Sequence, residues 1–225
     1  MKCVLLCLFS IQLLIAEEVE KYTFVLPGDS RLQEVSAKVS LEELQSKHLQ
    51  EIIDQMFLIA RGERSDMEKG VMVGLAAPQI GILKRIILVD TGVEMGKEEL
   101  GQLEVFINPV LLKKSSTIVM EREGCYSVAD CLCGIVPRSE SVVVQALDRN
   151  GFSLTREFSG MTARIFQHEI DHLEGIRFPD RVGPDGVLHW VKEDEYPEYR
   201  KNWQQWKVLC SWSDWCAMKS GKKHN

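Results

Sequence analysis

The stretch Ile165–Phe178 reads IFQHEIDHLEGIRF and places His168 and His172 four positions apart, with Glu169 beside the first. On an α-helix, residues i and i+4 lie on the same face, about one turn apart. Both imidazoles can therefore be directed at one metal ion, while Glu169 projects around the helix and stays free to handle protons. The same spacing also occurs by chance on solvated helices, so the pattern alone leaves a coincidental match open.

A catalytic metal is usually held by three protein ligands and a water molecule, so a third ligand is needed. Glu174 lies too close along the helix to complete the shell, and the following GIRFPDRVGPDG contains no histidine. We interpret Glu174 and Asp171 as charges on the helix surface. Upstream, EREGCYSV places Cys125 directly after Gly124, whose flexible backbone would let the chain turn and present a thiolate. A lone cysteine is nevertheless more often an inert, buried small residue.

A third segment, MVGLAAPQIG, runs from Met72 to Gly81. It contains a run of small residues, and Gln79 with its amide side chain stands at the end of this run. Taken alone, it is most simply a tight turn before a strand. Together the three segments resemble the peptide deformylase family, in which Gly-x-Gly-Leu-Ala-Ala-x-Gln, Glu-Gly-Cys-x-Ser and Gln-His-Glu-x-x-His occur in this order. The similarity extends to VLPGDSRL and VPRSESVVVQALDRNG and covers about Tyr22 to Arg181.

This resemblance implies an α+β fold of short β-strands in antiparallel sheets, packed around a central helix that carries the His-Glu-x-x-His motif. It also divides the chain into an apolar leader over residues 1–21, a catalytic domain over 22–181 and a tryptophan-rich C-terminal extension over 182–225. The leader is either a signal peptide or an extra N-terminal element.

The same resemblance implies a metal-dependent hydrolase that removes the N-formyl group from the N-terminal formylmethionine of new polypeptides and releases formate. Its one divalent metal is expected to be Fe²⁺, with Zn²⁺, Ni²⁺ or Co²⁺ as alternatives. The expected metal ligands are Cys125, His168 and His172. The expected catalytic groups are the Glu169 carboxylate, the Gln79 amide and the Tyr126 backbone N–H. The expected substrate contacts are Val73, Gly74, Tyr126, Arg164 and Ile165.

Several features depart from the family pattern near the expected substrate pocket. Met72 replaces the first glycine of the first motif, and Tyr126 stands where leucine is common. Arg164 stands where an apolar side chain usually lines the methionine pocket, so it either extends outward or alters the substrate preference. No arginine lies between Cys125 and Pro137, where many relatives carry one near the substrate. These differences affect the pocket rather than the metal chemistry.

Sequence patterns also predict the elements around the motifs. Ser40 and Glu43 have capping-box spacing and predict an amphipathic helix after them. A second helix is expected from about Ser159 to Gly175, a natural C-terminal stop. The tail carries all five tryptophans and is either a helix packed on the body or an interface for a partner. Runs rich in β-branched residues predict strands at residues 85–90, 104–109, 116–121, 141–148 and 152–158.

The composition, 45% hydrophobic and 27% charged, is that of a soluble globular protein. A net charge of −6 argues against a general nucleic-acid-binding surface. The seven cysteines form no recognised disulfide framework, so we interpret most of them as thiols in a reducing compartment. The expected partners are a formyl-Met peptide and the ribosome.

The N-terminus contains an apolar run from Cys3 to Ala16. This run is too short for a stable membrane span, which needs about 20 residues, but it resembles the hydrophobic region of a secretory signal. Leu14 stands where a small residue should precede the cleavage site. We expect a cytoplasmic protein, with export or an organelle as alternatives. The rival functions are a related metallo-amidase or peptidase and a non-catalytic peptide-binding homologue.

Overall fold

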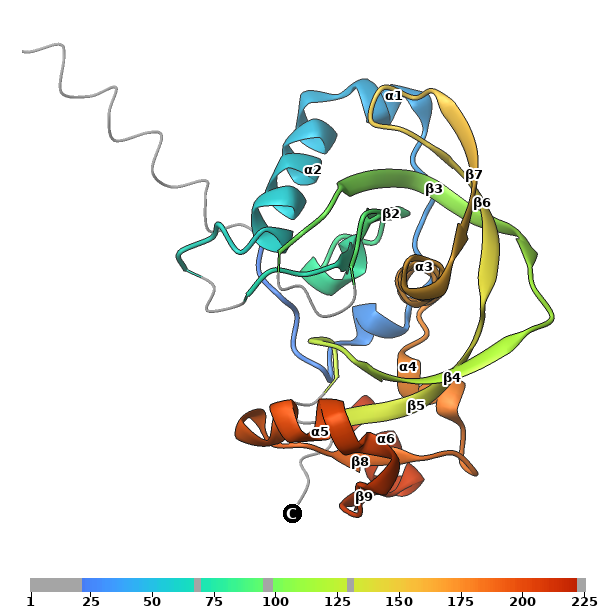
Figure 1. Ribbon diagram of the computed structural model, residues 1–225. Helices are drawn as coiled ribbons and strands as arrows, with labels where there is room; N and C mark the ends of the chain where they lie inside the picture. The colour runs from blue at the N-terminus through green and yellow to red at the C-terminus, as the bar shows by residue number, and fades with distance from the viewer. Residues whose placement is uncertain (1–21, 67–69, 95–98, 129–131, 222–225) are drawn as a thin grey trace, which may run out of the picture.

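The computed structural model describes residues 22–66, 70–94, 99–128 and 132–221. Two antiparallel sheets surround the helix α3 (Gly160–Leu173), which Figure 1 shows end-on near the centre of the molecule. The predicted α+β fold, with short antiparallel strands around one central helix, is confirmed. The leader predicted at residues 1–21 lies outside the described residues.

The larger sheet contains most of the predicted strands. Its order is β1 (Gly74–Ala76), β2 (Ile86–Asp90), β3 (Leu103–Lys114), β6 (Ser141–Leu147) and β7 (Ser153–Ser159), and every neighbouring pair is antiparallel. Strand β2 is buried along its whole length, whereas β6 alternates between buried and more exposed side chains. These are the two patterns expected of strands covered on both faces or on one. The runs at 85–90, 104–109, 141–148 and 152–158 were thus predicted correctly.

The smaller sheet has the order β4 (Ile118–Gly124), β5 (Leu132–Ser139), β8 (Leu188–Trp190) and β9 (Leu209–Cys210). Only β4 was predicted, because β5 contains Gly134 and Pro137, which are typical of loops. Gly134 is needed for packing: a Cβ there would lie 2.9 Å from side-chain atoms of both Leu188 and Phe178. The glycine therefore lets β5 approach β8 and the short helix α4 (Phe178–Val182) closely.

The capping signals read from the sequence are present. Ser40 Oγ accepts a hydrogen bond from Glu43 N, and the Glu43 carboxylate accepts one from Ser40 N. The expected helix is split into α1 (Leu41–Gln45) and α2 (Lys47–Ala60), because Ser46 ends the first and caps the second. Helix α3 ends as predicted, with Gly175 in the left-handed region at φ 69°.

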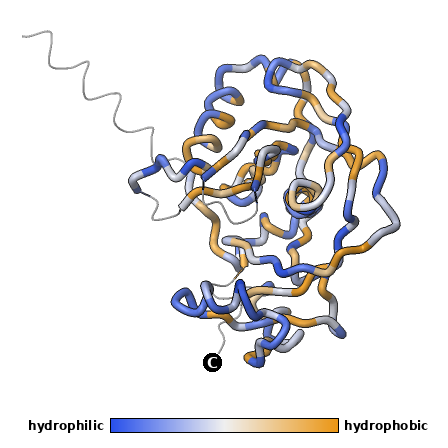
Figure 2. The backbone as a smooth tube through the Cα atoms, in the orientation of Figure 1, coloured by the Kyte–Doolittle hydropathy of each residue, from blue (hydrophilic) through white to orange (hydrophobic). Residues whose placement is uncertain are grey.

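Aromatic packing sets the orientation of α3 against the larger sheet. Phe166 on α3 lies 4.7 Å from Phe106 and 4.4 Å from Phe158, measured between ring centroids. Figure 2 shows that hydrophobic segments of α3 and of the inner strands lie near the centre of the molecule. Because Phe166 lies on the side of α3 that packs against the larger sheet, His168 and His172 lie on the side that faces the smaller sheet.

The tryptophan-rich tail packs on the body, but it is not a single helix. After β8 it forms α5 (Tyr196–Asn202), β9 and α6 (Trp212–Lys219), and β8 pairs with β5 of the body. Trp215 is fully buried, and its indole N–H donates to Asp180 at 3.0 Å. The Arg177 guanidinium lies over the same ring, 4.7 Å from its centroid. The tail therefore completes the smaller sheet.

Candidate metal centre

Three potential metal ligands meet where the end of β4 reaches α3. Cys125 follows β4 directly, and His168 and His172 lie one turn apart on α3. Their ligand atoms all lie within 4.8 Å of one another, and Cys125 Sγ is 3.3 Å from His172 Nε2. The three side chains expected to bind metal are therefore close enough to share one ion.

Hydrogen-bond donors point at the sulfur of Cys125 from two directions. Ser127 N lies 3.4 Å and Gln79 Nε2 lies 3.5 Å from Sγ. The Gln79 amide is itself held in place, because its Oε1 accepts from Ala76 N at 2.7 Å and its Nε2 donates to Ser127 Oγ at 3.1 Å. These contacts suit a sulfur that carries negative charge and aim the amide N–H of Gln79 at the centre.

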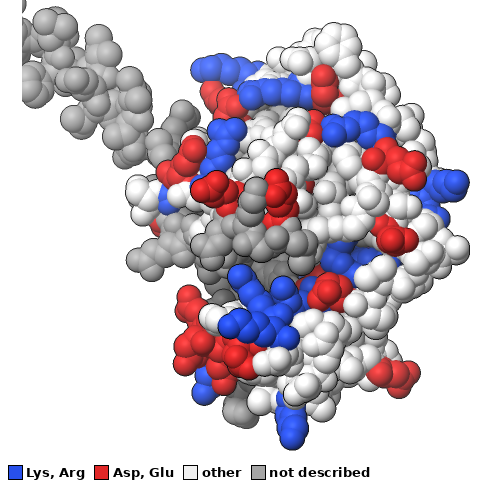
Figure 3. Space-filling view, in the orientation of Figure 1, with Lys and Arg blue, Asp and Glu red and all other residues white. Residues whose placement is uncertain are grey.

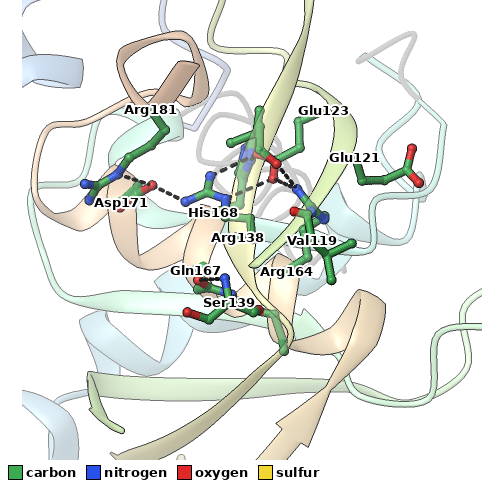
Figure 4. A network of polar contacts seen from close by, with 12 residues as sticks. Val119, Glu121, Glu123, Arg138, Ser139, Arg164, Gln167, His168, Asp171 and Arg181 are labelled. Carbon is green, nitrogen blue, oxygen red and sulfur yellow. Dashed lines mark hydrogen bonds and ion pairs between the residues drawn. The ribbon is translucent and has the colours of Figure 1, made fainter. Parts of the chain in front are cut away.

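The buried carboxylate of Glu123 holds the first histidine from behind. Its Oε2 lies 2.8 Å from His168 Nδ1. Arg138 donates two hydrogen bonds of 2.9 Å to the same carboxylate, and Arg164 donates a third of 2.7 Å. Figure 4 shows His168, Arg138 and Arg164 converging on Glu123. With Nδ1 engaged in this way, Nε2 of His168 is the nitrogen left to face an ion.

These charges shift the pKa values of the site in different directions. Burial alone would raise the pKa of Glu123, but hydrogen bonds with His168 and Arg138 hold it well below its ordinary value. Against the effect of burial, Cys125 and Glu123 raise the pKa of His168, so a cation at Nε2 would have to displace a proton. Burial lowers the pKa of His172, which keeps that imidazole in the neutral form that binds metals.

Replacing Glu123 by Gln should lower the free energy of unfolding by about 3–5 kcal/mol, because Arg138 and Arg164 would keep buried charges without their shared counterion. Denaturant unfolding of both proteins measures this loss. Glu104→Gln is the matched control, since Glu104 pairs with Arg156 at 2.9 Å where both side chains are partly exposed. An exposed pair of that kind contributes about 1 kcal/mol or less.

The effect of Glu123→Gln should also depend on pH. The pKa of Glu123 is ordinarily 4.5 and lies well below this in the folded protein. Between these two values the unfolded state binds more protons, so the contribution of Glu123 is complete above about pH 4.5 and declines as the pH falls further. A stability difference between wild type and variant that stays constant from neutral pH to pH 3 would contradict this account of Glu123.

Asp171 was predicted to be a surface charge, and this prediction is wrong. The side chain is buried and accepts hydrogen bonds from Arg138 at 2.5 Å and from Arg181 at 2.5 Å. It lies on the face of α3 that meets β5, so it extends the Glu123 network along the helix (Figure 4). Glu174 does lie nearer the surface, where it pairs with Arg85 at 2.7 Å.

Glu169 is buried beside the three potential ligands. It is 5% exposed, and its Oε2 has no hydrogen-bond partner among the described residues. Burial raises its pKa to about 7. A Cβ on Gly74 would collide with the Glu169 carboxylate and with Ile165, so only glycine leaves room for this arrangement. An unpartnered buried carboxyl beside two imidazoles and a thiol fits a bound cation, whose charge would favour the ionised form.

An open cleft of about 1090 Å³ leads to this centre. It is lined by nearly all of the predicted site residues: Val73, Gly74, Gln79, Cys125, Tyr126, Arg164, Ile165, His168 and Glu169. His172 lies behind this wall and is fully buried. The residues predicted for ligand, proton-transfer and substrate roles are thus gathered around one space.

The residues that depart from the family pattern, Met72, Tyr126 and Arg164, all line the cleft. Met72 is buried at the cleft wall. Arg164 does not extend into solvent, since its guanidinium donates to Glu123 and to the backbone oxygens of Val136 and Val119. The network around Glu123 was missed, although this residue begins the Glu-Gly-Cys motif. Other lining residues that sequence reasoning missed are Arg122, Glu193, Tyr196, Tyr199 and Arg200.

Comparisons with known proteins agree with this architecture. The family model described as "Polypeptide deformylase" matches residues 21–186. A peptide deformylase of Thermomicrobium roseum is 36% identical over 77% of this chain and 92% of its own length. The mitochondrial peptide deformylase of Homo sapiens is 33% identical over 75% of this chain and 71% of its own length. The chloroplastic peptide deformylase 1A of Solanum lycopersicum is 41% identical, and the match spans 59% of its length.

Solved structures give the same result. A class I type b peptide deformylase from Acinetobacter baumannii, bound to Met-Ala-Ser, superposes with a TM-score of 0.62 at 35% identity, covering 72% of this chain and 98% of that one. A peptide deformylase from Synechococcus elongatus in complex with actinonin has a TM-score of 0.60 at 31% identity. No helix of the described residues combines the length and apolar character needed to cross a bilayer. From the matched motifs, the fold and these relatives, the chain belongs to the polypeptide deformylase family.

Proposed function

We propose that this protein removes the N-formyl group from the N-terminal formylmethionine of newly made polypeptides and releases formate. The observation that carries this proposal is the meeting of Cys125, His168 and His172 beside the buried Glu169, at the end of an open cleft. The assignment is supported by its relatives, which include peptide deformylases of bacteria, a plastid and a mitochondrion.

The centre would hold one divalent cation through Cys125 Sγ and the two histidines, and we propose Fe²⁺ as the native ion. Two imidazoles and a thiolate are borderline-soft ligands that also accept Zn²⁺, Ni²⁺ or Co²⁺. Such an ion supplies Lewis-acid chemistry by making a water molecule acidic near neutral pH and by polarising a carbonyl group. The hydrogen bond between Glu123 and His168 supports this ligand set, because carboxylates commonly orient metal-binding histidines.

Glu169 moves the proton in the proposed reaction. It accepts a proton from the attacking water as the water oxygen bonds to the formyl carbon. It then gives this proton to the amine nitrogen as the carbon–nitrogen bond breaks, so that formate and a free N-terminal methionine leave. The carboxylate lies close against Gly74, and its burial suits a group that alternates between protonated and ionised states.

The charge that develops on the formyl oxygen would be met by fixed N–H donors. Gln79 Nε2 already points at the centre, because the other end of the amide is hydrogen-bonded to Ala76 N. The backbone N–H of Tyr126 is the second donor in this proposal. Removing one such donor typically lowers the rate by about a hundredfold or more. Val73, Gly74, Tyr126, Ile165 and Arg164 would contact the methionine end of the peptide from the cleft wall.

The test is metal analysis of protein purified without oxygen, combined with an assay for formate. We expect about one metal ion per chain and formate release from formyl-Met-Ala-Ser. Acetyl-Met-Ala-Ser and unmodified Met-Ala-Ser are the comparison peptides. Faster cleavage of the acetylated or unmodified peptide would instead indicate an amidase or a peptidase, and binding without cleavage would indicate a non-catalytic homologue. If Fe²⁺ is the native ion, air should inactivate the Fe²⁺ form faster than the Ni²⁺ form, since iron and thiolate can both be oxidised.

We further propose that the protein works close to ribosomes, in the cytoplasm. A substrate that exists only while new chains are being made supports this location. The plastid and mitochondrial relatives support an organelle as the alternative. The mature N-terminus, read by sequencing the protein isolated from cells, decides whether residues 1–16 are retained.

A further inference from the structure

The tail forms one wall of the cleft, although all of it after residue 186 lies outside the segment that matches the family model. The lining residues Glu193, Tyr196, Tyr199 and Arg200 all come from this part of the chain. We propose that Arg200 on α5, together with Arg122 on β4, recognises an acidic side chain of the peptide downstream of the formylmethionine. This inference rests on the proposed function and adds a substrate preference to it.

Helix α5 is fixed firmly enough to serve as a binding wall. Tyr199 is buried, and its hydroxyl lies 3.0 Å from His189 Nδ1 on β8. Its ring packs against Trp206 with 5.3 Å between centroids, and the Trp206 indole N–H donates to the backbone oxygen of Trp190 at 2.8 Å. Tyr196, one turn before Arg200, lies 3.5 Å from Cys133 Sγ on β5. Because these contacts hold the inner face of α5, the position of Arg200 at the cleft is set by the fold.

The two arginines are available for a ligand. Within the part of the chain that the structure describes, neither the Arg122 nor the Arg200 guanidinium makes a hydrogen bond or an ion pair. Both residues line the same cleft, Arg122 from β4 and Arg200 from α5, and the charge of Arg122 opposes the rise in the pKa of Tyr199 that burial causes. Figure 3 shows basic side chains gathered in the part of this face where α5 lies. Guanidinium groups recognise carboxylates through two parallel hydrogen bonds.

The position of Arg122 on β4 determines which residue of the peptide would meet the arginines. Glu193 lines the same cleft as Tyr126, and its charge adds to the effects of burial and Cys125 in raising the pKa of that phenol. Tyr126 in turn follows the potential ligand Cys125 in the chain. Arg122 precedes Cys125 by three residues along β4, which is about 10 Å of extended chain, and an extended peptide covers about the same distance between its formyl group and its third residue. The preferred acidic side chain is thus expected at the third residue rather than the second.

The test compares formyl-Met-Ala-Asp-Ser, formyl-Met-Ala-Asn-Ser and formyl-Met-Ala-Lys-Ser as substrates of the metal-loaded protein. The readout is the ratio of kcat/KM for the Asp peptide to that for the Lys peptide. Wild type should favour Asp, and Arg200→Ala should lower the ratio by about two- to fivefold, as expected for a partly exposed ion pair. Arg200→Glu should reverse the preference, and the change should lie mainly in KM. Added salt should weaken the discrimination of the wild type.

Lys201→Ala is the matched control, since Lys201 is the neighbouring exposed basic residue of α5 and does not line the cleft. Its ratio should equal that of the wild type. If Arg200→Ala and Arg200→Glu change the rates for Asp, Asn and Lys peptides equally, α5 has only a structural role and the inference is wrong. Equal kcat/KM values for all peptides in the wild type would overturn it while leaving deformylation intact. Cleavage of none of the peptides would overturn both proposals.

Discussion

Replacing Glu169 by Gln should lower kcat for formate release by a factor of about 10²–10⁴, the usual contribution of a positioned acid–base group. The amide has the shape of the carboxyl group, so it fits the space beside Gly74 and Ile165 that a Cβ on Gly74 would close. It cannot accept the proton of the attacking water or return one to the amine. Metal content should stay at the wild-type level, because Glu169 is not one of the three proposed ligands. Steady-state assays and metal analysis of the same samples measure both quantities.

Glu174→Gln is the control for this experiment. Glu174 caps the end of α3, pairs with Arg85 near the surface and does not line the cleft. Its loss removes a carboxylate from the same helix without touching the centre, so kcat should stay close to the wild-type value. If Glu169→Gln keeps the wild-type kcat while Glu174→Gln does too, the proposed route of the proton is wrong.

Local patterns in the sequence were sufficient to predict α3 and its two histidines. The spacing of His168 and His172 is a property of one helix, and Gly175 marks its end within the same segment. Most strands of the larger sheet are likewise continuous β-branched runs. Cys125 is different, because nothing near it indicates which element it will meet. Its partnership with α3 came only from the resemblance to a family, and the structure shows the two within reach.

The predictions that failed concern contacts between distant segments. Asp171 looks like any charged residue of a helix, and only the arrival of Arg138 on β5 makes it a buried ion-pair partner. Strand β5 itself was not predicted because Gly134 and Pro137 are typical of loops. The reason for a glycine at position 134 is its packing against α4 and β8, which the local sequence does not show. Arg200 was not recognised as a cleft residue for the same reason, because it reaches the cleft through the pairing of β8, in the tail, with β5 of the smaller sheet. Periodicity along the chain carries no information about such pairings.

Replacing Cys125 by Ala should reduce the metal content well below one ion per chain, and formate release should fall with it. Only the two histidines would then be left as protein ligands, and a catalytic centre of this type usually needs three. The loss should also remove metal-dependent stabilisation. A metal present at 100 times its dissociation constant raises the free energy of unfolding by about 2.7 kcal/mol, so Tm should rise on metal addition for the wild type but not for Cys125→Ala.

Cys133→Ala is the matched control, because Cys133 is a second thiol that lines the same cleft, eight positions further along the chain. Its sulfur lies on β5, contacts Tyr196 of the tail and is not part of the group formed by Cys125, His168 and His172. Metal content should therefore stay at the wild-type level when it is removed. Equal metal content in Cys125→Ala and Cys133→Ala would mean that sulfur is not a ligand. The centre would then have to be built from the two histidines and a different third group, such as the buried carboxylate of Glu169.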